Sequence, residues 1–417
     1  MGSDGRKNPG RQGGWLPDGT AELESWLEGH RDRVDLRGDG RDLHPTVRAL
    51  QQLIESDPVL RMYANRMIEE EPQATGYSAH PLESVEQMLV LIDEVLTLAP
   101  EWGQQMVATP LGAILDWTMG TPSGFAFYRD PRVNEAIRDI LNAWRDFLDG
   151  PGSLVVLNDS PTGWMSEEAT RALGIEQFLH DPDDAHWGFG SWNDFFTRRL
   201  AEGARPVADP GDDTVVTAVC EATSYRIADG VQRRDDFWIK SEPYSLVDMF
   251  ASSESAEAFV GGTAYQAYLS PTDYHRWHSP VSGRVIRAVV LPGTYFSQAD
   301  TQGADAAEPT YSQGYLAHVA TRAVIEIEAD NASIGRVGVV LIGMSDVSSC
   351  VLAPHLQPGE HVGKGDEIGW FQYGGSSYCI AFRPGVIADF VLNAVPQGDD
   401  SGRAKVQVRS RLARAVA

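Results

Sequence analysis

The hydrophobic period of this chain changes from helical to strand-like near residue 205, and this change divides the sequence into two parts. Between residues 43 and 150, apolar side chains recur three and four positions apart, as Val85, Met88 and Leu89 do. That spacing is typical of one face of an amphipathic helix. After residue 205, short runs rich in β-branched residues, such as 284–290 and 337–342, lie between Gly and Pro positions, which is typical of strands joined by turns. We therefore expect an α+β protein, with a helical N-terminal domain followed by a β-rich domain of barrel-like or sandwich-like form.

The composition of each segment suggests where the domains begin and end. Residues 1–42 are rich in Gly, Asp and Arg, and we expect a mobile polar N-terminus there. Residues 43–188 form the expected helical domain. Residues 189–417 form the expected β-rich domain, and a chain of 417 residues is long enough for both to bury a core.

Charge narrows the classes of partner. The chain has 34 basic and 59 acidic residues, for a net charge of −25, so its field repels nucleic-acid phosphates and anionic lipid headgroups. We expect no nucleic-acid partner, and the sequence disfavours membrane contact because no apolar run approaches the ~18 residues of a membrane span. The N-terminus lacks the apolar core of a signal peptide. Three cysteines are too few for a disulfide framework or a zinc site. These features predict a soluble cytoplasmic protein. No metal ligands are assigned, and metal dependence stays open.

One short segment carries a specific chemical signal. Gly374-Gly375-Ser376-Ser377 follows a strand-like run, and His275 and His278 lie about a hundred residues earlier. Without other context, the first segment is an ordinary surface turn and the second a polar cluster. Together they indicate a peptide bond that breaks itself, because glycine permits close approach of a serine hydroxyl to the preceding carbonyl and a histidine can take the hydroxyl proton. Elimination and hydrolysis of the resulting ester would leave a pyruvoyl group.

Four blocks in order give the chain a family resemblance. They are 193–200 (NDFFTRRL) with 203–206 (GARP), 273–283 (DYHRWHSPVSG), 363–369 (GKGDEIG) and 375–377 (GSS). Across roughly residues 190 to 400 the chain resembles the phosphatidylserine decarboxylases, a family of self-processing pyruvoyl enzymes. The helical N-terminal part is similar to the domain that accompanies some members.

The resemblance implies a role for each site residue. Cleavage would fall between Gly375 and Ser376, and Ser376 would become the covalent pyruvoyl cofactor, which forms a Schiff base with the substrate amine while carbon dioxide departs. His278 would activate Ser376, and His275 would protonate the product carbanion. Ser377 would be either a hydrogen-bond donor to the developing oxyanion or a turn residue. The two cleaved chains would remain associated, and a homo-oligomer is left open.

The chain departs from the family pattern at two places. Glu221 stands where the family has an Asp that orients the histidine, and we expect the longer carboxylate to take that role, although Glu221 could also be a solvated residue at a strand end. Gly374 and Ser377 give Gly-Gly-Ser-Ser in place of Leu-Gly-Ser-Thr. With a helical N-terminal domain, this variant resembles the branch of soluble aromatic amino-acid decarboxylases.

Several functions stay open at this point. We favour decarboxylation of a free aromatic amino acid resembling tryptophan, because the chain is acidic and has no membrane anchor. The alternative within the family is a phosphatidylserine decarboxylase that makes phosphatidylethanolamine. Outside it are an uncleaved scaffold without activity and, from the run around Lys364, a carrier similar to lipoyl and biotinyl domains.

Overall fold

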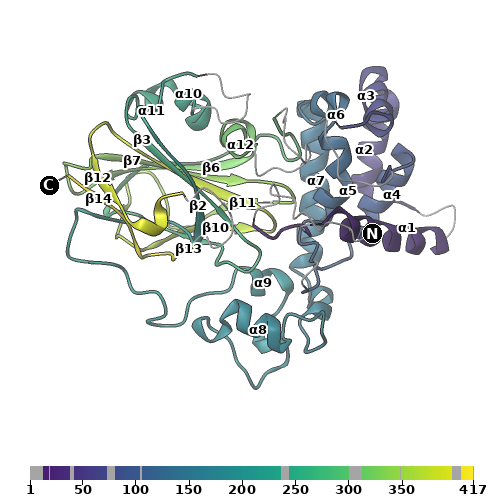
Figure 1. Cartoon of the computed structure of the whole chain (residues 1–417), viewed down its shortest axis with the longest axis horizontal. Coiled ribbons are helices and arrows are strands. Elements are labelled where there is room, and N and C mark those ends of the chain that lie inside the picture. The colour runs from purple at the N-terminus through teal and green to yellow at the C-terminus, as the bar shows by residue number, and fades with distance from the viewer. Residues whose placement is uncertain are drawn as a thin grey trace, which may run out of the picture.

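The computed structural model describes residues 13–17, 19–37, 42–72, 80–103, 106–235, 244–299, 312–347, 349–396 and 405–416. Figure 1 shows the helices of residues 20–148 gathered on one side and the strands on the other, with α8 (Glu167–Leu173) and α9 (Trp192–Phe196) beneath the junction and three short helices on the strand side. The α+β class is therefore confirmed. In this part of the chain, no helix is both long enough and apolar enough to cross a lipid bilayer.

Helices dominate the chain up to residue 196. Their bounds are α1 (Thr20–Arg37), α2 (Pro45–Ser56), α3 (Pro58–Glu69), α4 (Val85–Val95), α5 (Pro110–Met119), α6 (Pro122–Phe127), α7 (Pro131–Leu148), α8 (Glu167–Leu173) and α9 (Trp192–Phe196), with 3-10 turns η1 (Pro151–Val156), η2 (Ile175–Gln177) and η3 (Ala185–Gly188). Several begin with proline directly after a capping side chain. Asp130, for example, accepts a hydrogen bond from the backbone N–H of Arg132 at the start of α7, which satisfies a donor that has no partner within the helix.

The predicted mobile N-terminus needs correction. Residues 1–12 lie outside the described part, but Thr20–Arg37 forms α1. Leu23 and Leu27 are fully buried in the core of the helical domain, and Leu16 is buried nearby. The polar composition of this segment hid the apolar side of a helix. Leu23 and Leu27 are four positions apart, so they lie on one face of α1 and dock it.

The second part of the chain is built from antiparallel strands. Their bounds are β1 (Val215–Thr217), β2 (Ala222–Asp229), β3 (Thr263–Leu269), β4 (Arg276–His278), β5 (Gly283–Leu291), β6 (Arg322–Ala329), β7 (Arg336–Gly343), β8 (Ser349–Leu352), β9 (His361–Val362), β10 (Glu367–Gln372), β11 (Ser376–Phe382), β12 (Ile387–Phe390), β13 (Lys405–Val406) and β14 (Arg411–Ala415). Short helices α10 (Leu246–Phe250), α11 (Ser253–Glu257) and α12 (Gln313–Val319) and the 3-10 turn η5 (Leu392–Ala394) interrupt them.

These strands form one large sheet and two small ones. The large sheet has the order β13-β2-β3-β11-β7-β6-β5-β9, and the small sheets have the orders β1-β14-β12 and β4-β10-β8. The large sheet does not close on itself within the described residues, so the barrel form is not confirmed. Side chains of β11 alternate between two cores: Tyr378 and Ile380 pack toward the small sheets, and Cys379 and Ala381 pack in the core that includes α10, α11 and α12. This alternation is the period of a strand buried on both faces.

Candidate active site

Ser376 is the first residue of β11, which lies in the middle of the large sheet. Its register partners are Leu269 on β3 and Gly343 on β7. The side chain is 1% exposed, and its Oγ has no hydrogen-bond partner among the described residues. A buried hydroxyl without a partner is uncommon in folded proteins and calls for an explanation. Ser376 is therefore held on both sides by strands while its hydroxyl is left uncommitted.

The residues before Ser376 form a tight connection from β10 to β11. Gly374 has a φ of +119°, and a Cβ there would lie 2.6 Å from the carbonyl carbon of Asp346. Gly375 meets no such limit, since its nearest contact would be the carbonyl oxygen of Met344 at 3.5 Å. The Gly375 carbonyl oxygen accepts a hydrogen bond from the Met344 backbone N–H at 2.8 Å. The close approach thus requires glycine at 374, one residue before the bond predicted to break.

Ser377 is a strand residue and not a turn residue. It is fully buried, and its Oγ lies 3.5 Å from Nε2 of Gln266 on β3. Successive side chains on a strand point to opposite faces, so Ser377 faces away from the side on which Ser376 lies.

His275 lies in an aromatic cage at the junction of the two domains. Its ring stacks on Phe196 with 4.0 Å between centroids and meets the edge of Trp15 at 5.9 Å. Phe196 also packs against Tyr373, with 4.6 Å between ring centroids. Tyr373 belongs to the connection that leads to Ser376. Both ring nitrogens of His275 lack a partner among the described residues, and burial lowers the pKa of the imidazole well below its ordinary value. The ring is neutral, and its nitrogens are uncommitted although the side chain is fully buried.

His278 is bound on both sides of its ring. Nδ1 lies 2.9 Å from the Gly365 carbonyl oxygen, and Nε2 lies 3.0 Å from the Tyr274 hydroxyl. Because a carbonyl can only accept, the proton belongs on Nδ1, and Nε2 accepts from Tyr274. Arg409 Nε lies 3.2 Å from Nδ1 of His278 and 2.9 Å from the Gly365 carbonyl oxygen. Because the contact with the carbonyl oxygen is shorter, we assign the Arg409 hydrogen bond to it, and Nδ1 keeps its proton. Burial, together with Arg409, lowers the pKa of His278 to about 3.

Glu221 does not orient His278 in this structure. Its two carboxylate oxygens accept hydrogen bonds from Arg205 in a bidentate pair, from Nε at 3.0 Å and from Nη2 at 3.2 Å. The Gly365 carbonyl and Tyr274 orient His278 instead. Glu221 lies directly before β2, and Arg205 belongs to the GARP block. Their ion pair therefore fixes the start of the β-rich domain, and this carboxylate is not available to His278. No hydrogen bond joins Ser376 Oγ to His275, His278 or Glu221 in the described residues.

Asp273 is a site residue that sequence reasoning passed over. It is 2% exposed, accepts from the backbone N–H of Ser270 at 2.7 Å and pairs with Lys405. Burial raises the pKa of its carboxyl above the ordinary value, and Lys405 opposes the shift. The signal was its place two residues before His275. Arg198 braces the same turn by donating to the Thr272 carbonyl at 2.7 Å.

A cavity of about 350 Å³ opens between the two domains beside this turn. The helical domain and the residues before it contribute Gly13, Gly14, Trp102, Gly103 and Met106, and the β-rich domain contributes Thr223, Tyr268, Ser270, Pro271, Thr272 and Lys405. Lys405, Thr223, Tyr268 and Ser377 are successive register partners across the sheet. Directly opposed residues share a face, so the cavity lies on the face of Ser377, next to the start of β11.

Lys364 is not an exposed attachment site. Its Nζ donates to the carbonyl oxygens of Asp209 and Asp212 at 2.7 and 2.8 Å. A carrier lysine must extend freely from a hairpin, and this one is bound to the chain. The structure therefore disfavours the carrier hypothesis.

Comparison with known proteins identifies the family. Two profiles, each described as phosphatidylserine decarboxylase, match residues 44–173 and 192–414. The second covers more than half of the chain and all the candidate site residues. Similar proteins are named decarboxylases, and the chain is accordingly a carboxy-lyase. It belongs to the phosphatidylserine decarboxylase family, as the four sequence blocks predicted.

Individual relatives differ in how much of the chain they match. A decarboxylase called iboD from Amanita muscaria is 35% identical over 75% of this chain and 95% of its own length. The L-tryptophan decarboxylase of Psilocybe cubensis is 30% identical over 91% of this chain and 90% of its own length. Phosphatidylserine decarboxylase proenzyme 3 of Schizosaccharomyces pombe is 32% identical, but over 50% of this chain and 20% of its own length.

Proposed function

We propose that the chain cleaves itself between Gly375 and Ser376 and then decarboxylates a free aromatic amino acid, with tryptophan as the favoured substrate. The observation that carries the choice of substrate is the extent of the likeness. Similarity to the L-tryptophan decarboxylases runs through both domains, over 89–91% of the chain. Similarity to the phosphatidylserine decarboxylases named above and to their bacterial counterparts covers only about half of it. A cytoplasmic location is part of this proposal.

The surroundings of Ser376 fit a residue that becomes a pyruvoyl group. Its hydroxyl is buried and uncommitted, and the carbonyl it would attack already accepts a backbone N–H. A pyruvoyl ketone, once formed, supplies an electron sink for amine substrates. β11 is paired along its whole length with β3 and β7, which supports the proposal that residues 376–417 stay bound after cleavage.

The two histidines suit different proton transfers. His278 is neutral, fixed in orientation and basic at Nε2, so we assign it the proton of the Ser376 hydroxyl. Tyr274, which covers Nε2, must give up this contact or pass the proton along. His275 is neutral and has two free nitrogens in a buried aromatic cage. The substrate ammonium group must lose a proton before it attacks the ketone, and we assign His275 to take that proton and to return it to the product carbon. General acid–base groups of this kind contribute about 10²–10⁴-fold.

The cavity has a lining suited to an aromatic amino acid. It lies on the face of Ser377, and we propose that a substrate bound there reaches residue 376 around the start of β11. Trp102 and Tyr268 offer flat apolar surface to a ring, and Lys405, whose side chain is 40% exposed, offers a cation to a carboxylate. A volume of about 350 Å³ is within the range of small-molecule sites. Asp273 would hold the Lys405 ammonium group in position at the edge of the cavity.

Intact mass spectrometry of the purified protein tests the cleavage. We expect two chains, 1–375 and a ketone-blocked 376–417, whereas Ser376→Ala should give one full-length inactive chain. A cleaved and active Ser376→Ala protein would refute the assignment. A second assay compares tryptophan, phenylalanine and tyrosine with phosphatidylserine in liposomes. Turnover of the lipid alone would make the chain a phosphatidylserine decarboxylase, and a wild-type chain that never cleaves would make it a scaffold.

A further inference from the structure

A buried carboxylate of the β-rich domain caps a helix of the other domain. Asp346 lies in the turn between β7 and β8, and its oxygens accept the backbone N–H groups of Leu111 and Gly112 at 3.0 and 2.8 Å. These residues are in the first turn of α5, where N–H groups have no partner within the helix. Asp346 is fully buried, and burial raises the pKa of its carboxyl group to about 8, a shift that the N–H groups of Gly112 and Leu111 oppose. Carboxyl oxygens keep acceptor capacity in either protonation state, so the contacts with α5 do not depend on the charge.

The same turn holds the bond that is proposed to break. Met344, two residues before Asp346, donates its backbone N–H to the carbonyl oxygen of Gly375. Ser345 and Asp346 follow with φ values of 22° and 55°, a conformation that costs energy for residues with a side chain. Gly374 packs directly on this turn. The direction of the Met344 N–H therefore depends on a turn that Asp346 ties to the helical domain.

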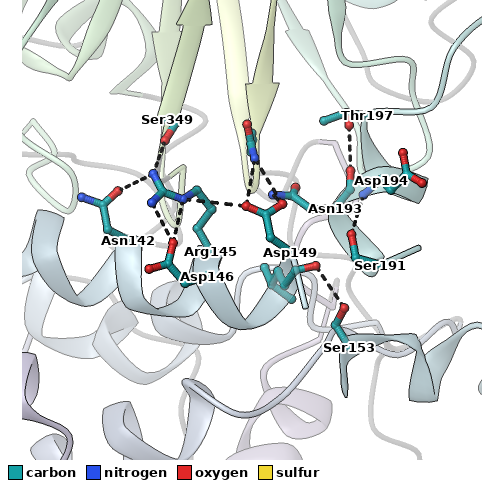
Figure 2. A network of polar contacts seen from close by, with 12 residues as sticks. Asn142, Arg145, Asp146, Asp149, Ser153, Ser191, Asn193, Asp194, Thr197 and Ser349 are labelled. Atoms are coloured by element: carbon teal, nitrogen blue, oxygen red, sulfur yellow. Dashed lines mark hydrogen bonds and ion pairs between the residues drawn. The ribbon is translucent and has the colours of Figure 1, made fainter. Parts of the chain in front are cut away.

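Other contacts from the helical domain hold the connection that precedes Ser376. The Tyr373 hydroxyl donates to the Ala108 carbonyl at 2.6 Å, and Gln372 Nε2 lies 3.4 Å from both carboxylate oxygens of Asp149. In Figure 2, Arg145 on α7 reaches from Asn142 and Asp146 to Ser349 on β8. Hydrogen bonds to the helical domain thus hold both the turn before β8 and the connection before β11.

We propose that the Met344 backbone N–H is the oxyanion donor for self-cleavage, and that Asp346 is a positioning residue through which the docked helical domain sets this donor. The inference rests on the proposed self-cleavage. Ser376 Oγ attacks the Gly375 carbonyl carbon, its proton leaves to the base, and the carbonyl electron pair moves onto the oxygen that faces Met344. The C–N bond then breaks, the Ser376 nitrogen takes a proton, and an ester remains.

The later steps do not need this donor. The Ser376 Cα loses its proton, the Cβ–Oγ bond breaks and the Gly375 carboxylate leaves. Water then replaces the nitrogen of the resulting enamine, which departs as ammonia. Negative charge on the carbonyl oxygen builds up only while the ester forms, so loss of the donor should slow ester formation. Loss of one such donor from an oxyanion site costs about 10²–10³-fold, and displacing it without removing it should cost at least about tenfold.

The experiment follows Asp346→Asn in the full chain, made by cell-free synthesis and sampled over time on denaturing gels. The carboxamide turns an NH₂ group toward one of the two α5 N–H donors, so one contact is lost. Asp330→Asn is the matched control, since Asp330 is an exposed carboxylate that contacts His361. Each sample is divided, and half is treated with hydroxylamine, which cuts an accumulated ester at Gly375 but not an amide. Ser376→Ala marks the uncleaved chain.

The outcomes separate the two proposals. If Asp346→Asn cleaves at least tenfold more slowly and hydroxylamine adds no fragment, while Asp330→Asn matches the wild type, the donor acts on ester formation as proposed. Wild-type speed in a folded Asp346→Asn chain overturns the inference, and so does an ester that hydroxylamine cuts. If Asp346→Asn does not fold, Tyr373→Phe decides, since it loses one contact with the helical domain and should slow cleavage severalfold. A wild-type chain that never cleaves overturns the proposed function itself.

Discussion

The two ends of the His275–His278 segment lie in different parts of the molecule. His275 faces the helical domain, in a cage formed by Trp15 and Phe196, and both of its nitrogens are free within the described residues. His278 lies inside the β-rich domain, and each of its nitrogens has a partner. Both rings are buried, and burial lowers the pKa of each. His275 and His278 therefore differ in whether their ring nitrogens have partners, and not in charge.

This contrast extends to the residues around them. The side facing the helical domain contains the cavity, Tyr373 and the turn at Asp346, so it is suited to bind a ligand and to respond to docking. The interior side contains a carbonyl and a phenol that fix one ring in one orientation. A ring with uncommitted nitrogens is suited to exchange a proton with a substrate at every turnover, whereas a ring fixed in orientation is suited to a single event within the chain.

Replacing each histidine by alanine is the strongest test of this contrast. We expect His278→Ala to slow self-cleavage by about 10²–10⁴-fold, because the base that takes the Ser376 proton is lost. His275→Ala should still cleave and should lose decarboxylation by a similar factor. Gel analysis measures the first effect and carbon dioxide release the second. If the two variants exchanged phenotypes, the assignment of roles would be reversed.

The glycine pair before Ser376 gives a second test at the same junction. Gly374→Ala must fit a Cβ 2.6 Å from the Asp346 carbonyl carbon at a φ of +119°, a strain on the order of 3 kcal/mol. If the strain displaces the carbonyl of residue 375, cleavage should slow by about 100-fold. Gly359→Ala is the matched control, because Gly359 also has a positive φ, +95°, but a Cβ there would meet nothing within 4 Å. Equal rates for both variants would show that the turn at Asp346 does not restrict the connection.

Trp102→Ala tests the cavity on the helical side. Trp102 lines the cavity and packs edge-on against Trp164 with 5.2 Å between centroids. Loss of one aromatic contact to the substrate is worth about 0.5–1.5 kcal/mol, so we expect the KM for tryptophan to rise about two- to tenfold while self-cleavage is unchanged. Trp102→Phe keeps a ring and should recover most of the affinity. An unchanged KM in Trp102→Ala would place the aromatic ring of the substrate elsewhere.

The sequence predicted those parts of the molecule that depend on local pattern. Helical spacing and strand-rich runs predicted the α+β class, and four blocks in order predicted the family. The burial of Leu23 and Leu27 was missed, because two apolar residues in a charged segment give a weak periodic signal. Closure of the sheet could not be predicted either, since it depends on pairing between strands that are far apart in the chain.

The site shows the same division. Ser376, His275 and His278 were predicted to be site residues because they lie within short motifs, and their roles stay predictions. Asp346 was missed because its partners, Leu111 and Gly112, are more than two hundred residues away, and no local pattern marks a side chain that caps a helix of another domain. The orienting role of Glu221 was wrong for a related reason. A carboxylate pairs with the cation that the fold brings to it, and here that cation is Arg205.

The smallest expected effect is the response of self-cleavage to acid. An imidazole with the ordinary pKa near 6.5 would be about 30-fold less available as a base at pH 5. His278 has a pKa lowered to about 3 by burial and by Arg409, so its neutral form persists, and the cleavage rate should change by less than about twofold between pH 5 and 7. Stability should fall in acid, because below about pH 6.5 the unfolded chain binds a proton that folded His278 refuses until about pH 3. If the cleavage rate of a chain that is still folded instead fell with a midpoint near pH 6.5, the base would be a solvated histidine. The contrast between a buried His278 in the interior and His275 at the domain junction would then not hold.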